Sequence, residues 1–304
     1  MPKRVAILGV PLAFGANMAG VDMGPSALRV ARLGQRIAQL GYEVRDLGDV
    51  PVAAARSPAA SDEPAKHLRE VTEACEHLAG KVQSALGDGD FPLVLGGDHS
   101  IAVGSVSGVA AHFKERGQGC VGLLWFDAHA DMNTAETTGS GNIHGMPLAA
   151  LLGHGLAELT HLAGFAPKLN PQWCAHIGAR DIDPGERELI KRTGVRFYTM
   201  REVDERGMAV CVDEALAIVS QSAAGYHVTV DVDVLDPGDA PGSGTLVRGG
   251  LTYRESHLAM EKVAERGGMV SLEIVEINTA LDTNNRTAEL GVELILSALG
   301  KKIL

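Results

Sequence analysis

The chain has 304 residues, 45% of them hydrophobic and 21% charged, an ordinary composition for a globular protein long enough to bury a core. Its formal net charge of −11 argues against a nucleic-acid partner, because such partners bind to basic surfaces. Its apolar runs all fall short of the roughly 20 residues that a membrane-spanning helix needs. We therefore expect neither a nucleic-acid nor a membrane partner.

The N-terminal sequence MPKRVAILGVP places basic residues before a short apolar run. That run is too short for a secretory signal and lacks a small-residue cleavage site, so we expect it to form the first strand. The cysteines, at positions 75, 120, 174 and 211, are scattered and include no CxxC pair. Reduced cysteines in a cytoplasmic protein are the expectation.

Short apolar runs alternate with helical patterns along the whole chain. These runs predict strands at 5–10, 43–47, 91–95, 121–127, 174–178, 195–198, 227–233 and 269–275. Pro25 and Pro64 each mark the expected start of a helix, and the last helix is expected to begin near Thr287. We expect 51–62 to be a surface connection, and 1–304 to be one α/β domain whose mainly parallel sheet is covered on both faces.

Polar motifs follow several of these predicted strands, at the strand ends where parallel sheets bind ligands. GGDHS places His99 directly after one strand. DAHAD carries Asp127, His129 and Asp131 after the next, and DVDVLDP carries Asp231 and Asp233. We expect these side chains to meet at one rim of the sheet.

Taken singly, the motifs differ in weight. A lone His99 after two glycines is as readily a capping or packing residue as a metal ligand. A DxD pair before a proline turn is more often solvated than metal-binding. DAHAD is stronger, because in an extended segment its three ionisable groups face the same side, where like charges are costly without a cation.

Taken together, the motifs offer carboxylates and imidazoles without a thiolate. This hard, oxygen-rich set suits Mn²⁺ better than structural Zn²⁺. Six side chains exceed what one catalytic ion with an open position needs, so two ions sharing bridging carboxylates fit better. Such a pair lowers the pKa of a bound water and produces a hydroxide nucleophile without Ser or Cys.

The strand-end motifs GGDHS, DAHAD, DVDVLDP and EIVEIN resemble those of the ureohydrolases. The stretches 133–145, 177–186 and 242–255 and the ending LGKKIL resemble the arginase family in particular, so that the resemblance covers nearly the whole chain. It implies a three-layer α/β/α fold with a central eight-stranded parallel sheet. It also implies Mn²⁺-dependent hydrolysis of L-arginine to L-ornithine and urea by a hydroxide that bridges two ions.

The resemblance assigns ligands to both ions. One Mn²⁺ would be held by His99, Asp127, Asp131 and Asp231. The other would be held by His129, Asp127, Asp231 and Asp233. Asp127 and Asp231 would then bridge the ions, whereas Asp98 and Asp236 are expected to have supporting or turn roles.

The resemblance also assigns residues to the substrate. Glu276 would hold the permanently cationic guanidinium over the metals, His144 would transfer protons, and Asp131 would relay a proton to the leaving nitrogen. The α-carboxylate would meet Asn133, Thr138 and Ser140. The α-ammonium would meet Asp183, with Glu186 further out.

Three alternatives remain open at this point. An agmatinase or guanidinobutyrase would share the metals. It would differ in the contacts that 133–145 and Asp183 make with the α-carboxylate and α-ammonium of the substrate. A metallophosphatase would want basic residues for phosphate, whereas these motifs are acidic. A non-catalytic binding protein would have no need of Glu276 and His144.

Three positions depart from the family pattern: Val234 replaces a usual glycine, and Leu246 and Thr279 each replace a usual proline. None removes a ligand, but each changes a loop near the site. The resemblance also predicts a homotrimer or a homohexamer. Its intersubunit ion pairs would involve Asp204, Arg254 and Glu255, for which a solvated charge cluster is the alternative.

Overall fold

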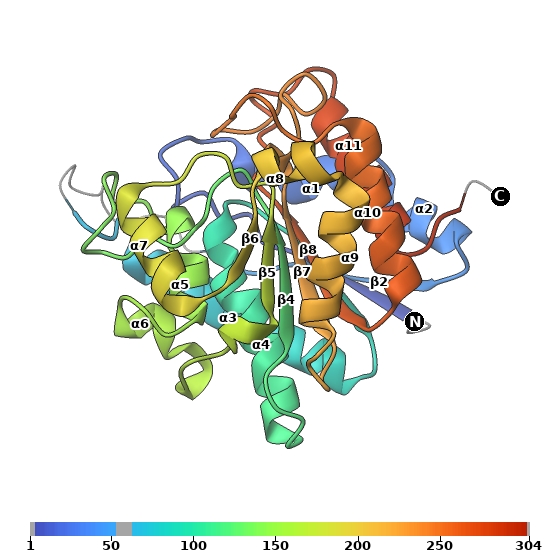
Figure 1. Cartoon of the computed structure of the whole chain (residues 1–304). Coiled ribbons are helices and arrows are strands. Elements are labelled where there is room, and N and C mark those ends of the chain that lie inside the picture. Colours follow the sequence, from blue (N-terminus) through green and yellow to red (C-terminus); the bar gives the residue numbers. More distant parts are fainter. Residues whose placement is uncertain (1–3, 53–62, 303–304) are drawn as a thin grey trace.

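The computed structural model describes residues 4–52 and 63–302. These residues form one eight-stranded sheet with the strand order β2-β1-β3-β8-β7-β4-β5-β6, in which all neighbouring strands are parallel (Figure 1). The strands are β1 (Arg4–Gly9), β2 (Glu43–Asp49), β3 (Phe91–Leu95), β4 (Gly122–Phe126), β5 (Cys174–Ile177), β6 (Arg196–Tyr198), β7 (Tyr226–Asp231) and β8 (Met269–Val275). The predicted α/β class and parallel sheet are confirmed.

Two buried clusters cover opposite faces of the sheet. In β4, Leu124 and Phe126 pack into one cluster and Leu123 and Trp125 into the other, as the alternation of a strand requires. Helices on the first face are α1 (Gly24–Val30), α2 (Leu33–Gln39), α8 (Met200–Arg206), α9 (Met208–Val219), α10 (Tyr253–Arg266) and α11 (Arg286–Ala298). Helices on the second are α3 (Leu68–Gly87), α4 (Ala102–Glu115), α5 (Pro147–Leu151), α6 (Ala157–Thr160) and α7 (Pro184–Thr193). The three-layer α/β/α fold is confirmed.

The order of the strands explains where the site lies. Although β3 and β4 are consecutive in sequence, β8 and β7 lie between them in the sheet. The strands that precede the polar motifs are therefore the adjacent set β3-β8-β7-β4 at the centre of the sheet. Their carboxyl ends meet at one rim, where α/β sheets bind ligands.

Some predicted boundaries were wrong. The expected strand 227–233 ends at Asp231, so that Asp233 belongs to a short 3₁₀ turn (Val232–Val234). Helix α3 begins at Leu68 rather than at Pro64, because His67 before it has a left-handed φ of 55°. Pro25 does lie in the first turn of α1, and α11 begins one residue before Thr287. Within the expected surface connection, 53–62 lies outside the described residues.

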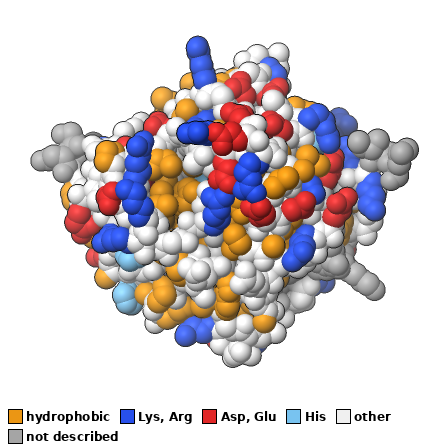
Figure 2. All heavy atoms as spheres, viewed as in Figure 1, with side chains coloured by type: hydrophobic (Ala, Val, Ile, Leu, Met, Phe, Trp, Pro, Cys, Tyr) orange, Lys and Arg blue, Asp and Glu red, His pale blue; other side chains and the backbone are white. Residues whose placement is uncertain are grey.

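The surface carries both signs of charge. Figure 2 shows Lys and Arg side chains interspersed with Asp and Glu over the face that α8, α9 and α10 form. Ion pairs such as Lys262–Asp213, at 2.8 Å, account for part of this intermixing. All cysteines are free. Among the described residues, no helix combines the length and apolarity needed to cross a bilayer.

Candidate metal centre and active site

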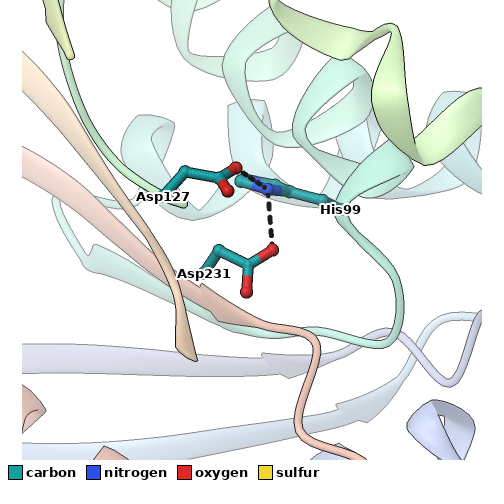
Figure 3. A group of neighbouring side chains, drawn as sticks. All are labelled: His99, Asp127 and Asp231. Atoms are coloured by element: carbon teal, nitrogen blue, oxygen red, sulfur yellow. Dashed lines mark ion pairs between the residues drawn. The ribbon is translucent and has the colours of Figure 1, made fainter. Parts of the chain in front are cut away.

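A first cluster of metal-ligating side chains gathers around the imidazole of His99. His99 opens a short 3₁₀ turn after β3, Asp127 follows β4 directly, and Asp231 ends β7. The Nδ1 atom of His99 lies 3.1 Å from Asp127 Oδ2, 3.1 Å from Asp131 Oδ2 and 3.3 Å from Asp231 Oδ2. Figure 3 shows the carboxylates of Asp127 and Asp231 directed at this ring. Side chains from three separate strand ends therefore converge on one point.

A second cluster lies beside the first and shares Asp127 with it. His129 Nδ1 is 3.0 Å from Asp233 Oδ2 and 3.5 Å from Asp127 Oδ1. Asp127, His129 and Asp233 could hold a metal ion, as could His99, Asp127 and Asp231. Asp127 thus offers one oxygen to each cluster. The sharing of Asp231 by both ions stays a prediction.

The electrostatics of the clusters fit a cation. His99 Nδ1 and Asp131 Oδ2 are buried without a hydrogen-bond partner in the described part of the chain. Burial and the neighbouring carboxylate of Asp127 raise the pKa of Asp131 to about 7. Burial and Asp233 likewise raise the pKa of Asp231 well above its ordinary range. Carboxylates packed this closely repel one another, and a divalent cation that prefers oxygen ligands stabilises them.

Neighbouring side chains orient the ligands. His99 Nε2 lies 2.9 Å from the hydroxyl of Thr229, which leaves Nδ1 directed at the carboxylates. The indole Nε1–H of Trp125 donates to Asp127 Oδ2 at 3.0 Å, and its ring stacks on His99 with centroids 4.3 Å apart. Such outer hydrogen bonds fix the ring orientation and charge of metal ligands.

The DAHAD segment converges by turning rather than by extending. Strand β4 ends at Phe126, so that the expected extended arrangement of residues 127–131 was wrong. The backbone N–H of His129 donates to Asp127 Oδ1 at 2.7 Å, and Asp131 adopts a left-handed φ of 52°. A positive φ in a non-glycine residue is costly and needs support from its surroundings. The turn nevertheless brings Asp127, His129 and Asp131 to the predicted place.

Glu276 follows β8 and is 2% exposed. Its Oε1 atom accepts a hydrogen bond from the backbone N–H of His99 at 2.9 Å and lies 2.9 Å from His144 Nδ1. Burial disfavours the imidazolium of His144, but the Glu276 carboxylate outweighs that effect and raises the pKa of His144 to about 9. Glu276 also has a positive φ, of 63°.

A pocket of about 200 Å³ opens above the two clusters. Its lining includes these predicted site residues: His99, His129, Asp131, Asn133, Ser140, His144, Asp183, Glu186 and Asp231. It also includes Asp181 and Thr245, which are not among the residues predicted from the sequence. Both lie in stretches that resemble the arginase family, ARDID and GSGT. Their place in these stretches is the sequence feature that could have identified them as site residues. Thr245 donates to Asp233 Oδ2 at 2.9 Å.

The residues predicted to bind the α-carboxylate and α-ammonium of the substrate differ in their hydrogen bonds. Asn133 Nδ2 donates to Asp183 Oδ2 at 2.9 Å, so that these two are within reach of one small ligand. Glu186 accepts from the backbone N–H groups of Met132 at 3.0 Å and Asp183 at 2.8 Å, which ties the DAHAD loop to the Asp183 loop. The hydroxyl of Thr138 is absent from the pocket lining and instead accepts from the Gly141 N–H at 3.0 Å.

Asp98 and Asp236 hold turns, as expected of residues outside the ligand set. Asp98 accepts from the backbone N–H of Gly15 at 2.9 Å and of Ser100 at 3.1 Å. Asp236 accepts from the backbone N–H of Gly238 and of Gly249, each at 2.9 Å.

The chain has a three-layer α/β/α fold, and its parallel sheet ends in Asp–His clusters beneath an acidic pocket. This combination is typical of metal-dependent hydrolases. The family model described as the Arginase family matches residues 3–300, and the chain belongs to this family. The arginase of Bacillus caldovelox is 48% identical over 303 residues, which are 99% of this chain and 100% of that protein.

Solved structures agree with this assignment. The crystal structure of the native Bacillus caldovelox arginase matches with a TM-score of 0.94 at 48% identity and covers 100% of both chains. The Entamoeba histolytica arginase, in complex with L-ornithine, matches with a TM-score of 0.90 at 28% identity over 98% of this chain and 99% of that one.

Proposed function

We propose that this chain is a catalytic domain, 1–304, that hydrolyses L-arginine to L-ornithine and urea with two Mn²⁺ ions. One observation carries the proposal: Asp127 lies in both ligand clusters, and a pocket lined by His99 and His129 of these clusters is also lined by Asn133 and Asp183. The arginase family membership supports the same reaction. The Entamoeba histolytica enzyme, crystallised with L-ornithine, supports the product.

His99, Asp127, Asp131 and Asp231 would hold one ion, and His129, Asp127, Asp231 and Asp233 the other. Nδ1 of His99 and Oδ2 of Asp131, which are buried without a hydrogen-bond partner among the described residues, support this assignment. The absence of a thiolate among the clustered side chains favours Mn²⁺ over structural Zn²⁺. Ions bound there supply positive charge and a hydroxide nucleophile at neutral pH.

The chain's own residues would bind and orient the substrate. The Glu276 carboxylate, which is buried and accepts the His99 N–H, would pair with a guanidinium that stays cationic at every physiological pH. Asn133, Thr138 and Ser140 would contact the α-carboxylate. Asp183 would contact the α-ammonium, with Glu186 supporting the Asp183 loop.

Two residues would move protons. His144 lies at the pocket wall, and its contact with Glu276 keeps the imidazole protonated at neutral pH. It can therefore supply a proton to a departing amine and recover one from solvent. Asp131, which lines the pocket, would relay a proton to the leaving nitrogen.

The experiment is a metal-restoration assay. Protein stripped with a chelator and reloaded with Mn²⁺ should release urea and ornithine in equal amounts from L-arginine, whereas stripped protein should be inactive. Co²⁺ and Ni²⁺ reloading serve as comparisons of metal choice. Full activity in the stripped protein would contradict the metal-dependent mechanism.

The assembly and location are proposals as well. We expect a cytoplasmic homotrimer or homohexamer with Asp204, Arg254 and Glu255 at the subunit interface. Within one chain, Arg254 pairs with Glu261 at 3.2 Å and Glu255 caps α10 through Thr252. Arg254 is exposed and Glu255 is partly exposed, which leaves both charges accessible to a neighbouring subunit.

A further inference from the structure

Arg180, just after β5, makes an unusual set of contacts. Its guanidinium donates hydrogen bonds to backbone carbonyls only. The acceptors are the carbonyl oxygens of Asp233 at 2.6 Å, Val247 at 2.7 Å, Gly178 and Val234 at 3.2 Å and Leu235 at 3.3 Å. Within the described ranges, no carboxylate lies at ion-pairing distance from Arg180. A side chain with five donors in a planar fork is thus used entirely to hold backbone.

The carbonyls belong to segments that are distant in sequence. Gly178 follows β5, residues 233–235 follow β7, and Val247 lies in the loop that leads to α10. Asp181 and Asp231, which line the pocket, lie close in sequence to the first two segments, and the third carries Thr245, which donates to Asp233 Oδ2 at 2.9 Å. Asp233 is therefore held twice, at its backbone by Arg180 and at its carboxylate by the loop that Arg180 also holds.

Leu246 stands directly before Val247, in the loop that Arg180 holds. Leu246 is 39% exposed, and its N–H makes no hydrogen bond within the part of the chain that the structure describes. Leucine leaves the backbone more conformational freedom than proline does. The loop therefore depends on contacts such as those from Arg180 to Val247.

We propose that Arg180 is a positioning residue for the metal cluster of Asp127, His129 and Asp233, and that it supplies the loop rigidity that a proline at 246 would otherwise give. The inference rests on the proposed metal-binding function of that cluster. Lysine at 180 would keep the charge but present its donors from one point, so that it reaches only some of the carbonyls. Among the described residues, the side chains of the other cluster, around His99, receive no hydrogen bond from Arg180, and that cluster serves as an internal reference.

The test is Arg180→Lys, with metal content measured after equilibration at a series of free Mn²⁺ concentrations. Removing an outer partner of a metal ligand commonly costs about 10- to 100-fold in affinity. The variant should lose one equivalent at a concentration about 10-fold higher than wild type does, and keep the other equivalent as wild type does. Arg187→Lys is the matched control, because exposed Arg187 holds a single carbonyl, that of Ile182 at 3.1 Å.

The companion variant is Leu246→Pro in the Arg180→Lys background, which should recover most of the lost affinity. Two equivalents bound by Arg180→Lys with wild-type affinity would overturn the proposal. Loss of both equivalents together with a much lower melting temperature of the metal-free protein would also overturn it, since Arg180 would then support the fold as a whole. Failure of Leu246→Pro to restore binding would overturn the compensation. Metal counts do not depend on arginine turnover, so an inactive but metal-binding wild type would reject the proposed reaction without touching this inference.

Discussion

The Nδ1 atom of His144 lies 2.9 Å from Oε1 of Glu276, the same oxygen that accepts the backbone N–H of His99. One carboxylate oxygen thus joins the proposed proton-transfer residue to the turn that carries a proposed metal ligand. The position of Glu276 depends on a backbone φ of 63°, which a non-glycine residue adopts only with strong support. The protonation of His144 and the proposed binding of substrate by Glu276 would therefore be linked through one side chain.

The first prediction concerns that protonation in the metal-free protein. The Glu276 carboxylate raises the pKa of His144 from 6.5 to about 9 against the opposing effect of burial. Because the folded pKa is the higher one, the pair stabilises the fold fully below pH 6.5 and loses that contribution as the pH rises through about 9. An NMR titration of the imidazole should find its midpoint near 9 in wild type and at a much lower pH in Glu276→Gln. A wild-type midpoint below 6.5 would contradict the assignment.

The second prediction concerns the shared ligand. Asp127→Ala removes an oxygen from both clusters, whereas His99→Ala removes a ligand from one. Purified Asp127→Ala should therefore bind neither Mn²⁺ ion tightly, and His99→Ala should keep close to one equivalent. Elemental analysis after dialysis measures this directly. If Asp127→Ala retained both ions, its shared role would be wrong.

The third prediction separates substrate binding from metal binding. Glu276→Gln keeps the shape of the side chain but removes the charge that pairs with a guanidinium. The variant should keep its manganese and lose about 100-fold or more in kcat/KM, the order expected when a buried charged contact of a few kcal/mol is lost. Loss of manganese with unchanged substrate affinity would place Glu276 among the metal ligands instead.

The fourth prediction concerns the α-ammonium contact. Asp183→Ala should lower kcat/KM for L-arginine by roughly 10- to 100-fold, because a charge-assisted hydrogen bond is worth about 1.5–3 kcal/mol. 4-Guanidinobutyrate lacks the ammonium, and its hydrolysis should change far less. Asp183→Asn keeps a partner for Asn133 without the charge and should show the same substrate dependence. Equal losses for both substrates would indicate a structural role for Asp183.

The fifth prediction concerns assembly. Size-exclusion chromatography with light scattering at micromolar concentration should give the mass of a trimer or a hexamer. Arg254→Ala should shift the distribution toward smaller species. A wild-type monomer would reject the interface proposed for Asp204, Arg254 and Glu255.

The sheet and the location of the site could be predicted from sequence. The central parallel strands are buried and mostly apolar, so their runs differ from the amphipathic helices, whereas the edge strand β2 is largely exposed and polar. The motifs at the strand ends marked one rim. The order of the strands had no such signal, because the placement of β7 and β8 between β3 and β4 depends on long-range packing. Pro64 misled the prediction of α3, because proline favours the first turn of a helix but does not by itself start one.

The finer geometry of the site was beyond local patterns. The left-handed φ values of Asp131 and Glu276 need support from surrounding contacts. Such a conformation cannot be predicted from either residue type alone. The substrate contact of Thr138 stays a prediction; its hydroxyl also accepts the Gly141 N–H, a contact that only the folded loop reveals. The role of Arg180 could not be predicted from the sequence either. Its partners are backbone carbonyls, which every residue has, so no residue type identifies them.

The most direct test of the proposed function compares kcat/KM for L-arginine and agmatine with manganese-loaded wild-type enzyme. Agmatine keeps the guanidinium but lacks the carboxylate that Asn133, Thr138 and Ser140 are proposed to bind. Two lost charge-assisted contacts should cost on the order of 100-fold or more in kcat/KM, so L-arginine should be preferred by at least that factor. Comparable values for the two substrates would contradict the proposed arginine specificity.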